Sequence, residues 1–196
     1  ASQEELENLP SATKDALSAL IYDEDPNENG ENFKEQGNNL LKKASANKTL
    51  YPQVLEYYGQ GLEQKLSNLL LKAQLLSNRS HVHLLMGNNG HAIEEAKEAI
   101  KQLNTLVKLN VPADAKVTKV EDDEEIVVED PNALTEQKKK AAEDLKVKCL
   151  YRVAKAATGI KKYKLAIQYA EKALQSKSLS DQIKKDILKV KQTAVS

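Results

Sequence analysis

Apolar residues recur at three- and four-residue steps along most of the chain, and this spacing limits the fold more than any other feature. Such spacing places the apolar side chains on one face of an α-helix. The two clearest runs lie at 66–86 and 92–109. Their apolar positions are Leu66, Leu69, Leu70, Ala73, Leu76, Val82 and Leu85 in the first, and Ala92, Ile93, Ala96, Ala99, Ile100, Leu103 and Leu106 in the second.

The carboxy-terminal part repeats this pattern of two helices and a short break. Runs at 147–157 and 163–174 are separated by a glycine, and a last helix is expected at about 180–193. Ser178, with Asp181 three residues later, predicts a capping box at the start of that last helix. Aromatic residues make up only 4% of the chain, so the core must be mostly aliphatic. An aliphatic core built from such runs favours an all-α fold.

Small residues recur at matching places in successive helix pairs, where a small side chain lets two helices approach closely. Ala92 follows Ser80 by 12 residues, and Ala166 follows Ala154 by the same number. This is the spacing of the tetratricopeptide frame, whose period is about 34 residues. The full set is Gly37, Ser80 and Ala154 in the first helices and Gly61, Ala99 and Ala173 in the second helices. The sequence therefore predicts a solenoid of three helix hairpins followed by a capping helix.

A long acidic insertion interrupts this frame between the second and third repeats. Ala99 and Ala154 are 55 residues apart, where the frame expects 15. Residues 112–136 carry 2 basic and 9 acidic side chains, including the run 121–125. Such a charge run is expected to be solvated and mobile. For residues 126–128, a short strand and a docking segment are both open interpretations.

The net charge of +0 conceals an uneven distribution. Residues 137–196 carry 16 basic and 5 acidic side chains, which offsets the acidic remainder of the chain. Overall neutrality argues against a nucleic-acid partner, because a phosphate track needs an extended basic surface. The sequence has no apolar stretch of about 18 residues, so no membrane span is expected. A single cysteine excludes an intrachain disulfide framework.

Five polar residues are candidates for a binding site on the first helices of the three hairpins. Lys34 and Asn38 are four residues apart and share a helix face, as do Lys148 and Arg152. Asn78 and Arg152 occupy the same repeat position, two residues before the small anchor. Lysine and arginine only donate hydrogen bonds, and asparagine adds amide donors. The five together predict an anionic ligand, and carboxylates fit best.

Three short segments carry a resemblance to a known family. Residues 32–38 resemble the opening of a tetratricopeptide-repeat co-chaperone domain, 76–80 resemble the start of its second repeat, and 148–152 resemble the Lys-x-x-x-Arg of its third. The match includes all five positions of the family's two-carboxylate clamp. In that family, the clamp holds the carboxy-terminal Glu-Glu-Val-Asp of cytosolic heat-shock chaperones.

The resemblance implies a division of labour among the five residues. Lys34, Asn38 and Asn78 would hold the main-chain carboxylate of the peptide. Lys148 and Arg152 would bind its acidic side chains. The partner implied is heat shock protein 90, with heat shock protein 70 as the second choice.

The leading segment narrows the resemblance. Residues 16–24 are similar to the class of heat shock protein 90 co-chaperones called tetratricopeptide repeat domain protein four, and the likeness covers about residues 16–104 and 146–190. The predicted division is a leader at 1–30, and a repeat domain at 31–196 made of repeats at 31–65, 70–104 and 146–178, the insertion at 105–145 and the capping helix at 180–193. The resemblance implies a monomeric protein of the cytoplasm, with the nucleus as a second location.

Two other functional classes remain to be weighed. A general repeat scaffold could bind a different peptide or helix in the same groove, with the cations incidental. An enzyme is not expected, because the sequence has no phosphate loop, no metal-ligand spacing and no paired acid and base, and no cofactor is expected either. His81, His83 and His91 are interpreted as core or surface residues, and Cys149 as a small buried residue. The acidic run 121–125 could also mimic a ligand and occupy the basic groove.

Overall fold

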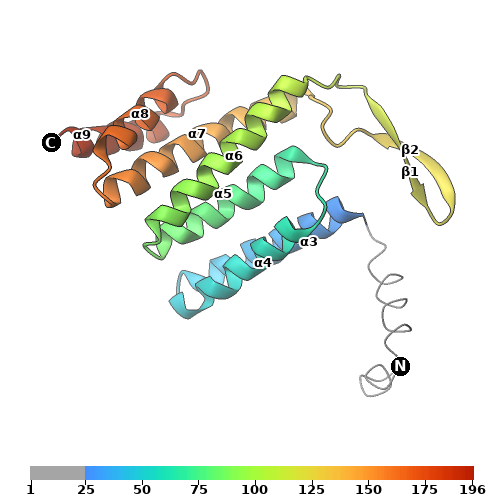
Figure 1. Ribbon diagram of the computed structural model, residues 1–196, viewed down its shortest axis with the longest axis horizontal. Helices are drawn as coiled ribbons and strands as arrows, with labels where there is room; N and C mark the ends of the chain where they lie inside the picture. The colour runs from blue at the N-terminus through green and yellow to red at the C-terminus, as the bar shows by residue number, and fades with distance from the viewer. Residues whose placement is uncertain (1–24) are drawn as a thin grey trace, which may run out of the picture.

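The computed structural model describes residues 25–196, and they form a mostly helical protein with one small hairpin of strands (Figure 1). The leader residues 16–24 that carry part of the family resemblance lie outside this range. The elements in chain order are α3 (Pro26–Ala44), the 3₁₀ turn η1 (Lys48–Leu50), α4 (Tyr51–Glu63), α5 (Leu69–Leu85), α6 (Asn89–Leu109), β1 (Lys116–Glu121), β2 (Glu124–Glu129), α7 (Glu136–Gly159), α8 (Tyr163–Leu174) and α9 (Asp181–Val195).

The helices pack in chain order, each against the one before it and the one after it. Helices α3 and α4, α5 and α6, and α7 and α8 form successive hairpins, with α9 packed on the end of the row (Figure 1). Helices α3, α5, α7 and α9 are also neighbours of one another. This places the first helix of each hairpin in one layer. The predicted helix pairs are confirmed, while the three-repeat tetratricopeptide arrangement and its boundaries stay a prediction.

The turns of the second and third hairpins have the same backbone geometry. Gly87 has φ 77° and Lys161 has φ 62°, and Lys161 lies 74 positions after Gly87, as Ala154 does after Ser80. The next residues also match, since the φ and ψ angles are −83° and 66° at Asn88 and −85° and 66° at Lys162. The local structure therefore repeats at the offset that the small residues define in the sequence.

The small residues of the predicted frame lie where helices come closest. A Cβ atom on Gly37 would lie 2.5 Å from the ring of Tyr58, and one on Gly61 would lie 3.0 Å from Leu75. The hydroxyl of Ser80 donates to the carbonyl of Ala92 at 2.7 Å, which joins α5 to α6. These contacts confirm the reason given for small side chains at these positions.

Three aliphatic clusters form a continuous core along the row of helices. The first lies among α3, α4 and α5 around Val54 and Tyr58, the second among α5 to α8 around Leu103 and Val153, and the third among α7, α8 and α9 around Ile187. Neighbouring clusters share helices, so each hairpin completes the core of the next.

Two helix boundaries differ from the sequence-based expectation. Helix α3 begins at Pro26, inside the stretch assigned to the leader, because Asp25 caps it by accepting from the backbone N–H of Asn27. Helix α9 is capped by Ser180, whose hydroxyl accepts from the backbone N–H of Ile183 at 3.2 Å. The predicted capping box starting at Ser178 is therefore wrong.

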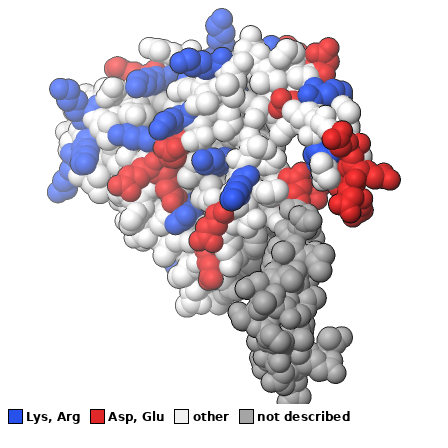
Figure 2. All heavy atoms as spheres, turned by 45° about the vertical axis from the view of Figure 1, so that its right-hand side comes forward, with Lys and Arg blue, Asp and Glu red and all other residues white. Residues whose placement is uncertain are grey.

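The acidic insertion is an ordered hairpin, which corrects both its predicted mobility and the purely helical fold class. Strands β1 and β2 pair antiparallel, with Glu121 opposite Glu124. Asp122 and Asp123, at φ 50° and 62°, form the two-residue turn, and aspartate tolerates this left-handed conformation better than most residues. Residues 126–128 belong to β2. The hairpin projects from the helical body, and Figure 2 shows its acidic side chains gathered on the right of the view.

The insertion is fixed to the helical body at both ends. Lys119 of β1 contacts the carboxylate of Asp25 at 3.3 Å. The side chain of Asn132 accepts from the backbone N–H of Leu69 at 2.9 Å and donates to the carbonyl of Ser67 at 2.8 Å. Within residues 25–196, no hydrogen bond or ion pair joins the acidic run to the basic candidate residues.

No helix in the described part of the chain is both long enough and apolar enough to span a bilayer.

Candidate functional site

Helices α3, α5 and α7 bring the predicted site residues into one row of contacts. Lys34 and Asn38 are on α3, Asn78 is on α5, and Lys148 and Arg152 are on α7. Side-chain hydrogen bonds link α3 to α5 and α7 to α5, so α5 is the shared middle of the row.

Asn38 is the most firmly held of the five. Its side-chain oxygen accepts two hydrogen bonds, one from the hydroxyl of Tyr58 at 2.5 Å and one from the amide of Asn78 at 3.1 Å. Both donors approach the oxygen, and among the described residues none engages the amide nitrogen of Asn38. The nitrogen is therefore left to donate to an outside acceptor.

Tyr58 fixes this orientation from the next helix, α4. Its side chain is fully buried, and burial raises the pKa of its hydroxyl to about 12, against a smaller opposing effect of the charge on Arg152. The hydroxyl is thus protonated at neutral pH and can only be a donor toward Asn38 Oδ1 in this geometry.

Lys34 lies at the other end of α3's contribution and is held against α5. Its ammonium donates to the side-chain oxygen of Gln74 at 2.8 Å and pairs with Glu31 at 2.7 Å. Only 16% of the Lys34 side chain is exposed, whereas Glu31 is 56% exposed. Glu31 can swing into solvent at little cost, which would leave the ammonium available for a different carboxylate.

Arg152 reaches from α7 to the residue beside Asn78. Its guanidinium donates to the backbone carbonyl of Ser77 at 2.9 Å and also to the Ser77 hydroxyl. Burial lowers the pKa of Arg152, yet an arginine remains charged at neutral pH because its ordinary pKa is so high. The guanidinium has five N–H donors, so these contacts do not exhaust it.

Lys148 differs from the other four because its side chain is exposed. It lines, together with Arg152, a cavity of about 290 Å³ between α5, α7 and α9. His81 and Lys155 line the same cavity. Burial and the charges of Arg152 and Lys155 lower the pKa of His81 to about 4. At neutral pH this wall therefore presents three cations and a neutral imidazole.

The other chemically active side chains are occupied elsewhere. His83 is buried, stacks on His91 with ring centroids 5.2 Å apart, and lies 3.8 Å from Glu95. It points away from His81, as expected for helix residues two apart. Cys149 is fully buried, and burial raises the pKa of its thiol. No group of metal-ligating side chains forms in residues 25–196.

The site thus combines fixed donors with a mobile cation. Sequence reasoning found the five polar residues but missed the side chains that orient them, namely Tyr58, Gln74 and Ser77. Gln74 and Ser77 are on the same helix as Asn78, at spacings that bring them near it. Tyr58 carries no comparable signal, because an aromatic residue in an apolar run is more often part of the core.

Two curated proteins share sequence with this chain. Over 86 residues it is 33% identical to the protein named Hsp70/Hsp90 co-chaperone CNS1 of Saccharomyces cerevisiae, a stretch covering 44% of this chain and 21% of the relative. Over 94 residues it is 31% identical to the Hsp70/Hsp90 co-chaperone cns1 of Schizosaccharomyces pombe, covering 48% of this chain and 25% of the relative. The chain is distantly homologous to these co-chaperones. The matches thus span only a fifth to a quarter of the relatives' length.

A solved structure extends the likeness at the level of the fold. The Hsp90 co-chaperone Cns1 from Saccharomyces cerevisiae (delta69) superposes with a TM-score of 0.59 at 23% sequence identity. The superposition covers 87% of this chain and 41% of the solved chain. No protein-family model matches the sequence.

Proposed function

We propose that this chain is a chaperone-docking module of a co-chaperone. In this proposal its helix hairpins are three tetratricopeptide repeats, and their first helices hold the carboxy-terminal acidic peptide of heat shock protein 90 or heat shock protein 70. The finer assignment, to the tetratricopeptide repeat domain protein four class, a monomeric protein of the cytoplasm, belongs to the same proposal. The relatives' description as Hsp70/Hsp90 co-chaperones supports the choice of partner.

The observation that carries the proposal is the hydrogen-bonded pair of Asn38 and Asn78. Because Asn38 Oδ1 is occupied by two donors, its amide N–H groups are oriented outward beside a lysine ammonium. A carboxylate accepts from two or three donors at once, and such charge-assisted bonds are roughly twice as strong as neutral ones. Lys34, Asn38 and Asn78 would therefore bind the terminal carboxylate of the peptide.

The second half of the site would bind the acidic side chains of the peptide. Arg152 keeps donors beyond those given to Ser77, and Lys148 is free to extend into the cavity that the two share. A neutral His81 adds a wall that does not repel an apolar residue of the peptide. The proposed reading order is thus terminal carboxylate on α3 and α5, then side chains on α5 and α7.

Calorimetric titration with a peptide ending in Glu-Glu-Val-Asp tests the proposal. The free-acid peptide should bind with micromolar affinity, about −8 kcal/mol. The same peptide ending in an amide should bind at least tenfold more weakly, since it lacks the terminal charge. Equal binding of acid and amide would refute the carboxylate clamp.

A general scaffold is the second candidate, and one observation favours it. Lys34 and Arg152 both use donors within the protein, on Gln74 and Ser77, as purely structural residues would. In this alternative the groove holds a different peptide or helix, and the cations only join the hairpins. Partners that still bind the doubly substituted Lys148→Ala, Arg152→Ala protein in a pull-down would support the scaffold.

A further inference from the structure

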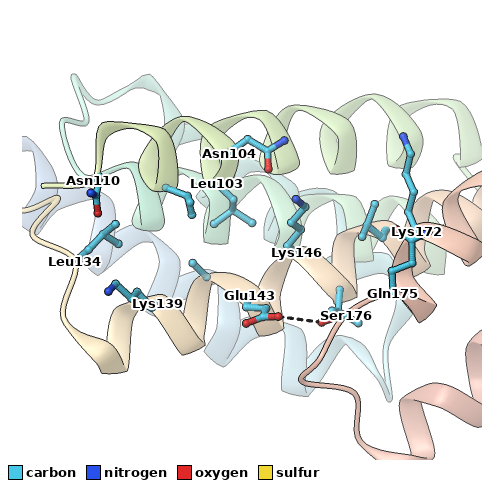
Figure 3. Close-up of a pocket in the computed structure, with 14 residues that line it drawn as sticks. Leu103, Asn104, Asn110, Leu134, Lys139, Glu143, Lys146, Lys172, Gln175 and Ser176 are labelled. Carbon is cyan, nitrogen blue, oxygen red and sulfur yellow. Dashed lines mark hydrogen bonds between the residues drawn. The ribbon is translucent and has the colours of Figure 1, made fainter.

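A second and larger groove lies between α6, the first half of α7 and the end of α8 (Figure 3). Its volume is about 500 Å³, within the range of roughly 300–1,000 Å³ typical of ligand pockets. The floor is aliphatic and buried, and it is formed by Leu103, Leu134, Val147 and Leu150. At one edge Val107 is 58% exposed, so the apolar surface continues out of the groove.

The rim of this groove is basic at its ends and acidic in its middle. Lys139 and Lys146 lie on α7, two helical turns or about 10 Å apart, and Lys172 faces them from α8. Between them Glu143 is held by the hydroxyl of Ser176 at 3.3 Å (Figure 3). Lys139 pairs with Glu136 only at an exposed site, where ion pairs are weak.

We propose that this groove docks an amphipathic segment of a partner protein, with aliphatic anchors in its middle and carboxylates at its two ends. The aliphatic floor accounts for the anchors. Lys139 at one end, and Lys146 with Lys172 at the other, account for the carboxylates. Glu143 excludes a further carboxylate from the centre, which sets the order of the pattern. The surplus of cations in residues 137–196, 16 against 5 acidic residues, adds a field of matching sign.

This groove is independent of the candidate clamp. None of Lys34, Asn38, Asn78, Lys148 and Arg152 lines it. Its proposed ligand is recognised through side chains and needs no free carboxy-terminus. The two sites can therefore be tested separately, on one protein.

Methyl-resolved NMR titration of the whole chain tests the proposal. The probe is an acetylated and amidated peptide, Glu-Glu-Ala-Leu-Ala-Ala-Leu-Leu-Ala-Glu-Glu, which carries no terminal charge. The methyl signals of Leu103, Val107 and Val147 should shift on titration, while those of Leu84 in the clamp cavity should not. A matched peptide with Lys in place of each Glu should bind at least tenfold more weakly. Absence of shifts at the groove methyls would overturn the proposal.

Two variants separate docking from general charge attraction. The triple substitution Lys139→Glu, Lys146→Glu and Lys172→Glu should weaken the probe at least tenfold. The control Lys164→Glu, Lys184→Glu and Lys189→Glu makes the same change in net charge on exposed residues of α8 and α9, and it should weaken binding less than threefold. Equal losses in the two triples would overturn the proposal.

A single apolar-to-charged change gives a readout that does not depend on the triple variant folding. Val107→Glu alters an exposed residue, so the fold should persist by circular dichroism while probe binding falls at least fivefold. Unchanged probe binding would overturn the proposal.

Two other occupants predict different results. Sedimentation that shows a dimer lost in Val107→Glu would assign the groove to a second copy. Groove methyl shifts in the free protein on Leu17→Ser and Leu20→Ser, with tighter probe binding, would assign it to the chain's own leader. Either result would overturn the partner proposal.

Discussion

The two halves of the candidate clamp are prepared for a ligand to different degrees. On α3 and α5, Asn38, Asn78 and Tyr58 form a closed set of hydrogen bonds that fixes every side chain before a ligand arrives. On α7, Arg152 is anchored to Ser77, but Lys148 is exposed. Preorganised donors save the entropy of ordering side chains on binding. The first half should therefore set the geometry of binding, and the second should add charge.

Arg152→Ala is expected to have the largest effect on this comparison. The substitution should weaken a Glu-Glu-Val-Asp peptide by about 2 kcal/mol or more, because a partly buried charge loses its partner. It also leaves the Ser77 hydroxyl without its donor. Calorimetry measures the loss. A change below about 0.5 kcal/mol would show that Arg152 only joins α7 to α5.

Tyr58→Phe tests whether preorganisation in the first half matters. The change removes one hydroxyl that donates to Asn38, so peptide affinity should fall by about 1 kcal/mol. The dependence of affinity on salt should stay the same, since no ligand charge is involved. Tyr57→Phe, on a neighbouring residue of α4, is the matched control and should bind as the parent does. An altered salt dependence in Tyr58→Phe would contradict the assignment.

Lys148→Ala should give a smaller loss of a different kind. An exposed cation contributes about 1 kcal/mol or less to a charged contact, and salt screens it. Affinity should fall about threefold at low salt and scarcely at all at high salt. Lys161→Ala, which also removes an exposed lysine, should have no effect at either concentration. A salt-independent loss of more than tenfold at Lys148 would place it among the fixed donors instead.

His81→Gln should produce the smallest effect, on stability and not on peptide affinity at neutral pH. The folded-state pKa of about 4 lies below the unfolded value of 6.5, so the unfolded chain binds the extra proton first. Stability should therefore be complete above pH 6.5 and fall as the pH drops toward 4. Partial exposure limits this contribution to about 1 kcal/mol between pH 7 and pH 5. Urea denaturation should show a shallower pH dependence in His81→Gln, and an unchanged one would contradict the shift.

The helices and the candidate residues followed from local pattern, whereas their connections did not. The apolar spacing predicted α5, α6 and α8, and the small residues at Ser80 and Ala154 predicted the close packing of their hairpins. The hydrogen bond from Tyr58 depends on a contact between α3 and α4 that no single run of sequence encodes. Local patterns fix elements, but only packing fixes which side chains meet.

The two errors about the fold have separate physical causes. The acidic run was predicted to be mobile from its charge, yet the β-branched residues on either side pair into strands and Asp122 and Asp123 suit the tight turn. In the last helix, both Ser178 and Ser180 precede the apolar run at plausible capping distances. Ser180 is the cap because its hydroxyl reaches the backbone N–H of Ile183.

A double-mutant cycle between protein and peptide tests most directly the claim that the two halves bind different parts of the ligand. Peptides with a free acid and an amide terminus are titrated into the parent, Asn38→Ala and Lys148→Ala. The account predicts that amidation costs at least about 1 kcal/mol less in Asn38→Ala than in the parent, and the full amount in Lys148→Ala. A full amidation cost in Asn38→Ala, with a reduced one in Lys148→Ala, would contradict the account.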